Sequence, residues 1–414
     1  MQSFVRNNLI GPCALALVSL LPSQGLCGQP YKVLYAFEGG TDGAYPSAAL
    51  IADQSGNLYG STENGGEMAA CAGFGCGTLF KITPDGIKTI LYTFNGGSDG
   101  GDPAQALMLD RDGNLFGSTF EGGDVAACGG YGCGVAFKLA TGGTFTVLDT
   151  FTGGSGGATP SSPLLRNPHG VLIGTAGYGG GGEGVIYRLA RNGKEQVLYS
   201  FAGAMDGADP SGSLVQDKKG DLTGTTILGG SSDDGSVYRL AADGTETVLH
   251  SFNGSDGWWP QGLIADHAGN FYGLTAAGGN PCEQSDEGCG QAFKLTGAGA
   301  FSVLHYFTGD NFGGIPVGSL VRDSKGNLYG STSQGGNQSD CGGVGCGTVF
   351  KLGPDGTPTA LYAFKGGSDG AFPESGLFEG ADGYLYGTTS GGGGGTGCQI
   401  LLTKGCGVVF KIMK

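Results

Sequence analysis

The sequence predicts an all-β fold: a seven-bladed β-propeller with four antiparallel strands in each blade. The main observation is a phrase close to VLYxF that recurs seven times along the chain. The copies end at Phe37, Phe94, Phe151, Phe201, Phe252, Phe307 and Phe364. Each unit also holds four strand-like segments in one order. A period of roughly fifty residues is typical of propellers and stacked arrays.

The four segments of a unit can be followed in the first copy. The first segment, PSAALIAD, begins at Pro46, and the second, NLYGST, contains Gly60. The third reads GTLFKI, and the fourth is the VLYxF phrase. We expect the proline to be the first residue of its strand, where no ladder donor is needed, and the glycine to mark a close backbone approach. Apolar and polar residues alternate in the last two segments, as in strands with two differently packed faces.

The connections between these segments alternate between short and long. Turns containing Asp-Gly or Asn-Gly join the first segment to the second and the third to the fourth. Such pairs supply the positive φ that tight hairpins require. The other two connections are long. In an up-and-down blade they lie on one face of the disc, where binding residues are expected.

The two ends of the repeat region favour a closed ring over an open solenoid. The region opens with a fourth segment, KVLYAF from Lys32, and closes with a third segment, GVVFKI, at Ile412. The last unit therefore lacks a strand that the first residues can supply. Pairing the two would close the ring and remove two sheet edges, which otherwise invite aggregation.

Residues 1–28 are predicted to be a secretory signal peptide. Arg6 precedes an apolar stretch from Leu9 to Leu21, and small residues follow it. A retained membrane anchor is the alternative, but the apolar run is short for a bilayer. Residues 29–414 are expected to form a single domain with no membrane span after cleavage. We expect a monomer that is secreted, with the periplasm or the cell surface as other locations.

The charge balance argues against one class of partner. The chain has 36 acidic residues against 21 Lys and Arg, a net charge of −15. An acidic surface repels phosphate backbones, so no nucleic-acid partner is expected. The 90 glycines recur at fixed offsets, which indicates turns rather than disorder.

Ten cysteines fall as five close pairs in the loops between second and third segments. They are Cys71 with Cys76, Cys128 with Cys133, Cys282 with Cys289, Cys341 with Cys346, and Cys398 with Cys406. The third and fourth units have shorter loops and no cysteine. We interpret the pairs as local disulfides, each stabilising by about 2 kcal/mol on the chain-entropy model. Zinc binding is the alternative, but it needs four ligands, and no histidine lies in these loops.

A second set of candidates lies in the loop after VLYxF, as in GGSDGAFP. Its aspartates are Asp42, Asp99, Asp206, Asp256 and Asp369, while the third unit has Gly156 instead. A ring of carboxylates offers oxygen ligands for Ca²⁺, or a partner for a cationic or polyhydroxylated ligand. The structural alternative is that Asp-Gly forms turns whose side chain caps backbone amides. We favour the structural interpretation and expect neither a metal site nor a cofactor.

Trp258 and Trp259 lie side by side in the same loop of the fifth unit. An exposed pair can stack on a sugar face or a peptide side chain, whereas a buried one packs between blades. No catalytic residue is predicted: no nucleophile elbow, zinc-binding helix or phosphate loop is found, and the four histidines are not expected to converge. Carboxylates from different blades can still meet at the axial mouth.

The combination VLYxF, GGSDGAxP, NLYGTT and GCGTVFKL, in fixed order, resembles the GloVer-type tandem repeat of bacterial secreted proteins. The resemblance covers the chain from about Lys32 to Ile412. It implies an extracellular protein, and the family supplies no catalytic residues to transfer.

Two functional hypotheses follow. The first is a secreted, non-catalytic propeller that binds a glycan or a protein through its long-loop face. The second is an extracellular lyase or hydrolase acting at the axial mouth, which rests on fold analogy alone. A binder is expected to present similar residues around the ring. An enzyme is expected to show one asymmetric cluster of His, Glu or Arg at the pore.

Overall fold

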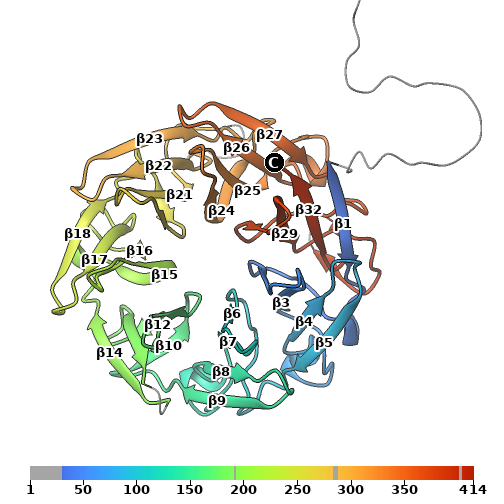
Figure 1. Ribbon diagram of the computed structural model, residues 1–414, viewed down its shortest axis with the longest axis horizontal. Helices are drawn as coiled ribbons and strands as arrows, with labels where there is room; N and C mark the ends of the chain where they lie inside the picture. The colour runs from blue at the N-terminus through green and yellow to red at the C-terminus, as the bar shows by residue number, and fades with distance from the viewer. Residues whose placement is uncertain (1–29, 191–192, 283–287, 401–402) are drawn as a thin grey trace, which may run out of the picture.

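A computed structural model describes residues 30–190, 193–282, 288–400 and 403–414. The chain forms a ring of seven antiparallel sheets around a central axis (Figure 1). The helical structure in these ranges is five short 3₁₀ turns, and none of it is long and apolar enough to cross a membrane. The predicted β-propeller is therefore confirmed. The predicted signal peptide, residues 1–28, lies outside the described residues.

Each blade has four strands, counted from the axis outward. In blades 3 and 5 the innermost strand is divided into two short strands, which both pair with the second strand. Blade 1 has β2 (Ile51–Ala52), β3 (Leu58–Thr62), β4 (Thr78–Ile82) and β5 (Lys88–Thr93). Blade 2 has β6 (Met108–Leu109), β7 (Leu115–Ser118), β8 (Val135–Leu139) and β9 (Phe145–Thr150). Blade 3 has β10 (Gly157–Pro160) and β11 (Leu165–Arg166), then β12 (Leu172–Gly179), β13 (Val185–Leu189) and β14 (Glu195–Ser200). Blade 4 has β15 (Ala208–Gln216), β16 (Leu222–Leu228), β17 (Ser236–Leu240) and β18 (Glu246–Ser251).

The remaining blades follow the same order. Blade 5 has β19 (Trp258–Pro260) and β20 (Ile264–Ala265), then β21 (Phe271–Ala277), β22 (Gln291–Leu295) and β23 (Phe301–Tyr306). Blade 6 has β24 (Gly314–Arg322), β25 (Leu328–Gln334), β26 (Thr348–Leu352) and β27 (Pro358–Ala363). Blade 7 has β28 (Phe378–Glu379), β29 (Tyr384–Thr389), β32 (Val408–Met413) and β1 (Tyr31–Ala36), and a small hairpin of β30 (Gln399–Ile400) and β31 (Thr403–Lys404) lies in its long loop. The 3₁₀ turns are η1 (Gly40–Asp42), η2 (Cys71–Gly73), η3 (Cys128–Gly130), η4 (Ala204–Asp206) and η5 (Cys341–Gly343).

The ring closes through the first strand. β1 pairs antiparallel with β32, with Tyr31 opposite Ile412 and Ala36 opposite Val408. β32 pairs on its other edge with β29. In Figure 1 the blue β1 lies beside the red β32. The predicted pairing of the leading and trailing segments is thus present, and blade 7 has its fourth strand.

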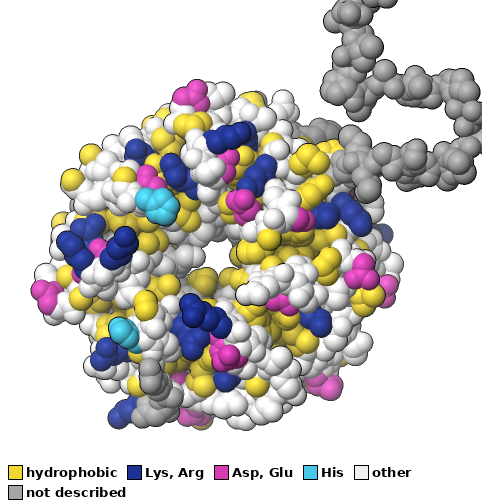
Figure 2. All heavy atoms as spheres, in the orientation of Figure 1, with side chains coloured by type: hydrophobic (Ala, Val, Ile, Leu, Met, Phe, Trp, Pro, Cys, Tyr) yellow, Lys and Arg dark blue, Asp and Glu magenta, His cyan; other side chains and the backbone are white. Residues whose placement is uncertain are grey.

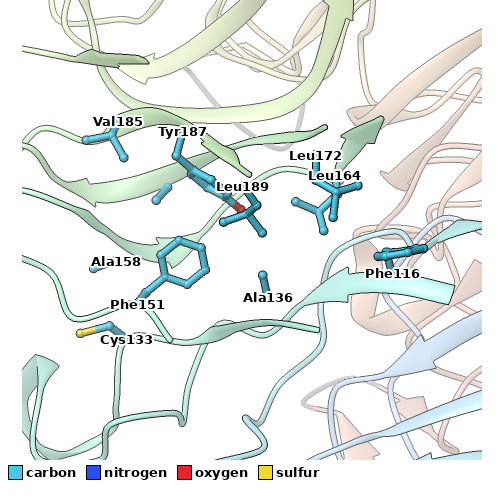
Figure 3. Close-up of a cluster of buried hydrophobic side chains, with 11 residues drawn as sticks. Phe116, Cys133, Ala136, Phe151, Ala158, Leu164, Leu172, Val185, Tyr187 and Leu189 are labelled. Carbon is cyan, nitrogen blue, oxygen red and sulfur yellow. The ribbon is translucent and has the colours of Figure 1, made fainter. Parts of the chain in front are cut away.

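The hydrophobic core consists of seven clusters, one at each interface between neighbouring blades. Figure 3 shows the cluster between blades 2 and 3, where Phe151 lies against Tyr187. In every cluster the phenylalanine of VLYxF meets, edge to face, an aromatic ring from the third strand of the next blade. The pairs are Phe37–Phe80, Phe94–Phe137, Phe151–Tyr187, Phe201–Tyr238, Phe252–Phe293, Phe307–Phe350 and Phe364–Phe410, with ring centroids 5.0–5.5 Å apart. Such a pair contributes about 0.5–1.5 kcal/mol beyond the area that it buries.

The glycine of the second strand makes room for this aromatic ring. Gly60 is the strand partner of Phe80, and a Cβ atom on Gly60 would lie 2.7 Å from Cζ of that ring. The same Cβ would lie 2.8 Å from Cδ2 of Leu50 on the inner side. The close approach predicted at this glycine is therefore an approach of side chains and not of backbone.

The proline of the first segment does not begin the inner strand as expected. In blades 1, 2 and 7 regular pairing starts five residues after it, and in blades 4 and 6 it lies inside the strand. The proline instead packs across the interface: a Cβ atom on Gly77 would lie 2.6 Å from Cδ of Pro103 in the next blade. Gly407 and Pro46 make the same contact across the ring closure. The proline is thus placed by its contact with a glycine of the neighbouring blade and not by the start of its own strand.

The connections sort onto two faces, as predicted. The crossover loop and the loop between second and third strands bond to each other, for example through the bridge between Ala44 and Asn64 and from Gly66 N–H to the carbonyl of Gly40. We call their side of the disc the long-loop face. The opposite side carries the hairpin turns and is called the tight-turn face.

Candidate functional site

The two faces differ in charge. Lys and Arg gather on the face seen in Figure 2, around the hollow at the centre of the disc. Of the Lys and Arg residues that the structure describes, only Lys365 and Lys404 lie in crossover loops or in loops between second and third strands. The long-loop face therefore carries most of the uncompensated negative charge of the chain.

Large apolar side chains are exposed mainly on the long-loop face. Nine of the eleven described lie there, namely Met68, Phe74, Phe120, Val125, Tyr131, Tyr178, Met205, Leu228 and Trp259. The other two are Ile87 in a tight turn and Met413 at the end of β32. Exposed apolar clusters of this kind mark interaction surfaces. The long-loop face is the candidate for binding.

Five of these exposed side chains, Phe74 and Tyr131 among them, belong to blades 1 and 2. Between the long loops of these blades lies a pocket of about 430 Å³. Its wall includes the exposed rings of Phe74 and Tyr131, 67% and 70% accessible, and the carboxylates of Glu63, Asp102 and Glu121. None of the residues lining it is Lys, Arg or His. We call this site the carboxylate pocket.

The two aromatic rings stand on a fixed backbone. Phe74 and Tyr131 occupy equivalent positions, directly after the 3₁₀ turns η2 and η3. Each loop is closed by a disulfide, Cys71–Cys76 or Cys128–Cys133, with Cα atoms 5.4 Å apart in both. The carbonyl of Phe74 accepts the N–H of Gly65, and that of Tyr131 accepts the N–H of Gly122. Because the backbone of both loops is already fixed, a ligand that binds to these rings would cost little further backbone entropy.

Asp102 is the most perturbed acid of the pocket. It has a φ of 56°, and its N–H donates across the interface to the carbonyl of Cys76 at 3.0 Å. Its Oδ1 is buried without a hydrogen-bond partner among the described residues. Burial, with Glu63 and Glu121 nearby, raises the pKa of Asp102 to about 7. Burial likewise raises the pKa of Glu63, and the negative charge of Glu374 raises it further.

Glu374 connects this pocket to the axial channel. The channel, about 360 Å³, is lined by residues of all seven blades that lie in or next to the inner strands, most of them Ser, Ala or Gly. Glu374 is the one ionisable residue in that lining, and it accepts a hydrogen bond from Ser390 Oγ at 2.7 Å. Glu374, Glu63, Asp102 and Glu121 belong to blades 7, 1 and 2, and a further buried acid among the described residues, Asp209, takes the position of Asp102 in blade 4. This is an asymmetric cluster in an otherwise regular ring.

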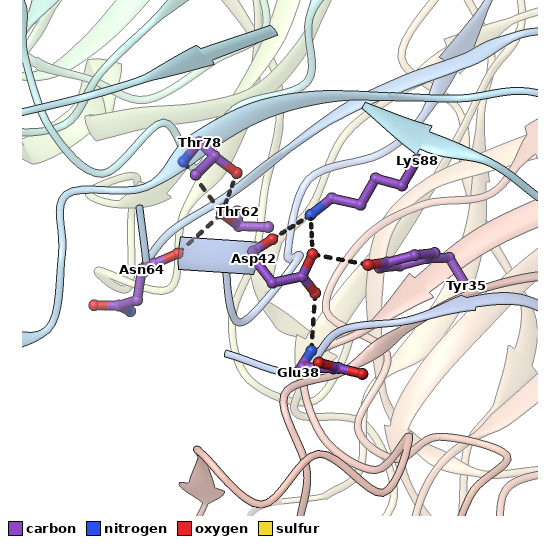
Figure 4. Close-up of polar contacts among 7 residues, drawn as sticks. All are labelled: Tyr35, Glu38, Asp42, Thr62, Asn64, Thr78 and Lys88. Carbon is purple, nitrogen blue, oxygen red and sulfur yellow. Dashed lines mark hydrogen bonds and ion pairs between the residues drawn. The ribbon is translucent and has the colours of Figure 1, made fainter. Parts of the chain in front are cut away.

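The five predicted loop aspartates bond within the rim of the disc. Asp42 accepts hydrogen bonds from Tyr35 at 2.7 Å and from the N–H of Glu38 at 2.9 Å, and it pairs with Lys88 (Figure 4). Asp99, Asp206, Asp256 and Asp369 make the equivalent two contacts, to Tyr92, Tyr199, His250 and Tyr362 and to the backbone N–H groups of Asn95, Ala202, Asn253 and Lys365. Among the described residues, no three acidic, Cys or His side chains could hold a metal ion. These contacts support the structural interpretation of the aspartates.

The two tryptophans stack on each other, with ring centroids 5.0 Å apart. Trp259 is 44% exposed, whereas Trp258 is half-buried and its Nε1 has no hydrogen-bond partner among the described residues. One ring of the predicted pair thus faces solvent on the long-loop face. Trp259 also occupies the position of Asp102 in its own blade, before the inner-strand proline.

The five predicted cysteine pairs are joined as disulfides, with Cα atoms 5.1–5.8 Å apart. Each stabilises a loop on the long-loop face. The Cys71–Cys76 bridge also packs on the crossover loop that leads to the next blade, because a Cβ on Gly96 would lie 2.6 Å from Sγ of Cys71. The glycine after VLYxF leaves space for the bridge.

Comparison with known families bears out the resemblance in the sequence. The model of the Gloeobacter/Verrucomicrobia repeat matches residues 22–226 and 181–401. The chain belongs to the Gloeobacter/Verrucomicrobia repeat family. A search of curated proteins found no match to this member of the family.

Solved structures similar to this Gloeobacter/Verrucomicrobia repeat protein include three propellers. The extracellular domain of a hybrid two-component system from B. thetaiotaomicron has a TM-score of 0.55 at 10% identity, over 88% of this chain and 39% of that one. A fungal alcohol oxidase of the AA5 family, in complex with copper, has a TM-score of 0.56 at 13% identity, over 93% and 76%. A candidate 6-phosphogluconolactonase from Bacteroides fragilis has a TM-score of 0.50 at 13% identity, over 81% of this chain and 87% of that one. At such identity the likeness shows the fold alone.

The acids of the carboxylate pocket were not among the predicted site residues. The signal that could have found them is departure from the family repeat. Glu63 has Phe120, Gly177 and Ile227 as its counterparts in the next three units, and Glu374 has Ser47. The repeated loop aspartates of this Gloeobacter/Verrucomicrobia repeat protein bond within the fold, whereas Glu63 and Glu121, which have no acidic counterpart in the other units, line a pocket.

The hydrogen bonds that Asp369 accepts at the rim predict that it stabilises the fold of this repeat-family protein. Asp369→Ala leaves the hydroxyl of Tyr362 and the N–H of Lys365 without their acceptor. We expect the free energy of unfolding in urea to fall by about 1–3 kcal/mol. Asp112→Ala, at an exposed aspartate of the tight-turn face, is the matched control and is expected to change it by less than about 0.5 kcal/mol. Equal stability of the two variants would count against the structural interpretation.

Proposed function

We propose that the chain is an extracellular, non-catalytic binding protein that holds a glycan or a protein ligand on its long-loop face, at the carboxylate pocket. The observation that carries the proposal is the pair of exposed aromatic rings, Phe74 and Tyr131, on disulfide-closed loops beside that pocket. Aromatic side chains on a rigid scaffold bury large area on binding at low entropic cost.

The charge of the site restricts the chemistry of the ligand. Glu63, Asp102 and Glu121 line the pocket, and no Lys, Arg or His among its lining residues offsets them. Polyanionic glycans would be repelled, whereas neutral sugars and amino-bearing groups fit. Sugar faces stack on aromatic rings, and an ammonium or guanidinium group is attracted both by the ring face and by the carboxylates.

Two observations support an extracellular location. The five disulfides are of the kind that forms and persists in oxidising compartments. A second supporting observation is the likeness of the ring to the extracellular domain from B. thetaiotaomicron. That likeness covers the propeller and 39% of the longer domain, so the location is part of the proposal.

The test is a binding screen of the oxidised protein on an array of neutral, amino-bearing and acidic glycans and of basic peptides. We expect hits among the neutral or cationic probes, and the double variant Phe74→Ala/Tyr131→Ala should weaken them at least tenfold, about 1.4 kcal/mol. Ile87→Ala removes an equally exposed apolar side chain from the tight-turn face and should leave binding unchanged. No hits, or hits that both variants retain, would overturn the proposal.

One observation favours a second function, an extracellular lyase or hydrolase. The asymmetric cluster at the axial mouth includes Asp102, whose pKa is raised to about 7 by burial and by the acids beside it. A carboxyl group that is partly protonated near neutrality can act as a general acid while a neighbouring carboxylate acts as a base. Cleavage of a neutral glycan that is lost in Asp102→Asn, with sugar binding retained, would favour this function. Equal cleavage by the variant and the parent would exclude it.

A further inference from the structure

The outer strands of the blades run head to tail around the rim (Figure 1). At six of the seven interfaces the first residue of one outer strand meets the fifth residue of the outer strand before it. We call this meeting the rim contact. At three interfaces it is a ring stack: Tyr31 on Tyr362, Phe145 on Tyr92, and Phe301 on His250, with centroids 3.8–4.0 Å apart.

A fourth rim contact uses opposite charges. Lys88 is the first residue of β5, and its ammonium lies 2.8 Å from Oδ1 of Asp42 and over the ring of Tyr35. It also donates to the backbone carbonyl of Asp42. At this interface a cation therefore compensates the loop aspartate.

Both interfaces of blade 3 depart from these patterns. At the interface with blade 2, Glu195 takes the first position and faces Asp149, which replaces the usual aromatic residue. Glu195 Oε1 accepts the N–H of Gly157 at 2.9 Å, and a Cβ on Gly156 would lie 2.8 Å from its Oε2. Glu195 thus supplies, from the next blade, the carboxylate that the loop lacks.

At the interface with blade 4, the position of Lys88 is occupied by Glu246, which faces Asp206. Asp206 already accepts hydrogen bonds from Tyr199 and from the N–H of Ala202 through Oδ2. Its Oδ1 and Oε1 of Glu246 are buried without a hydrogen-bond partner among the described residues, as is Oδ2 of Asp149.

Among the described residues, the groups recorded against these carboxyls carry no positive charge. Tyr187 and the Gly157 N–H lie with Glu195 and Asp149, and Tyr199 and Tyr238 lie with Glu246 and Asp206. Among the ion pairs of the described residues, none involves any of these four acids. Blades 3 and 4 also lack the disulfide found in the other five.

We propose that the two interfaces of blade 3 form a proton-dependent seam: they close tightly when each facing carboxyl pair holds a proton, and they loosen when both members of a pair are ionised. Ionisation of both would place two like charges together in a partly buried contact, which is unfavourable. A shared proton lets one carboxyl donate to the other. The seam lies away from the carboxylate pocket and does not depend on the proposed ligand.

The direction of the effect follows from the titration of the pairs. Burial and the facing acid raise the pKa of Asp149 from 3.8 to about 6 and that of Glu246 from 4.5 to about 7, and burial raises the pKa of Glu195. A carboxyl whose pKa is raised by folding stabilises the fold below its unfolded value and loses that contribution as the pH rises through the folded value. The seam therefore weakens between about pH 4 and pH 7.

The experiment compares melting temperatures at pH 5 and pH 8 for the parent and for Glu195→Gln/Glu246→Gln. The parent is expected to lose at least about 2 °C more than the double variant between the two pH values. Glu183→Gln removes one acidic charge at an exposed site of blade 3 and should behave as the parent. A double variant with the parent's pH dependence would overturn the proposal.

Hydrogen exchange on the parent protein locates the effect and does not depend on the folding of any variant. After correction for intrinsic rates, amides of β9, β13, β14, β17 and β18 are expected to lose protection from pH 5 to pH 8 more than those of β22, β23, β26 and β27, which lie in blades 5 and 6. Loss of protection spread evenly over all seven blades would contradict a seam at blade 3.

Discussion

An edge-to-face contact between two aromatic rings, repeated at every blade interface, is the interaction on which the ring depends. The phenylalanine of VLYxF leaves the outer strand of one blade and meets the third-strand ring of the next, with centroids 5.0–5.5 Å apart in all seven copies. Because a blade contacts only its two neighbours, each pair is needed for closure. β1 is the fourth strand of blade 7, and Phe37, the residue directly after it, belongs to the seventh pair.

The repeat explains the scaffold, and the departures from it indicate the function. Residues shared by the units, such as Gly60, Pro46 and Asp42, are fixed by packing or by hydrogen bonds within the ring. Residues that differ between units gather at two places, the carboxylate pocket of blades 1 and 2 and the interfaces of blade 3. A nearly symmetric disc thereby acquires one acidic, aromatic site and one weak seam.

Much of the fold could be predicted because every blade makes the same contacts with the next blade, so the residues that make them recur in each unit of the sequence. The strand order, the split blade 7, the cysteine pairs and the two loop faces all follow from aligned segments. The acids of the pocket and the channel could not be predicted in the same way, because Glu63, Asp102 and Glu374 are far apart in sequence and interact only when blades 7, 1 and 2 are placed side by side. The inner prolines were misjudged as strand starts because their partner, a glycine such as Gly77, belongs to another blade.

Closure by β1 can be tested directly by a cross-link between the two strands that complete blade 7. Lys32 and Lys411 are opposite each other in that pairing, and opposite Cα atoms in antiparallel strands lie about 4.5–5.5 Å apart, within reach of a disulfide. In oxidised Lys32→Cys/Lys411→Cys, peptide mapping is predicted to find the two substituted positions bridged within one chain, with a raised melting temperature. Free thiols or links only between chains in the folded variant would contradict a ring closed by its first strand.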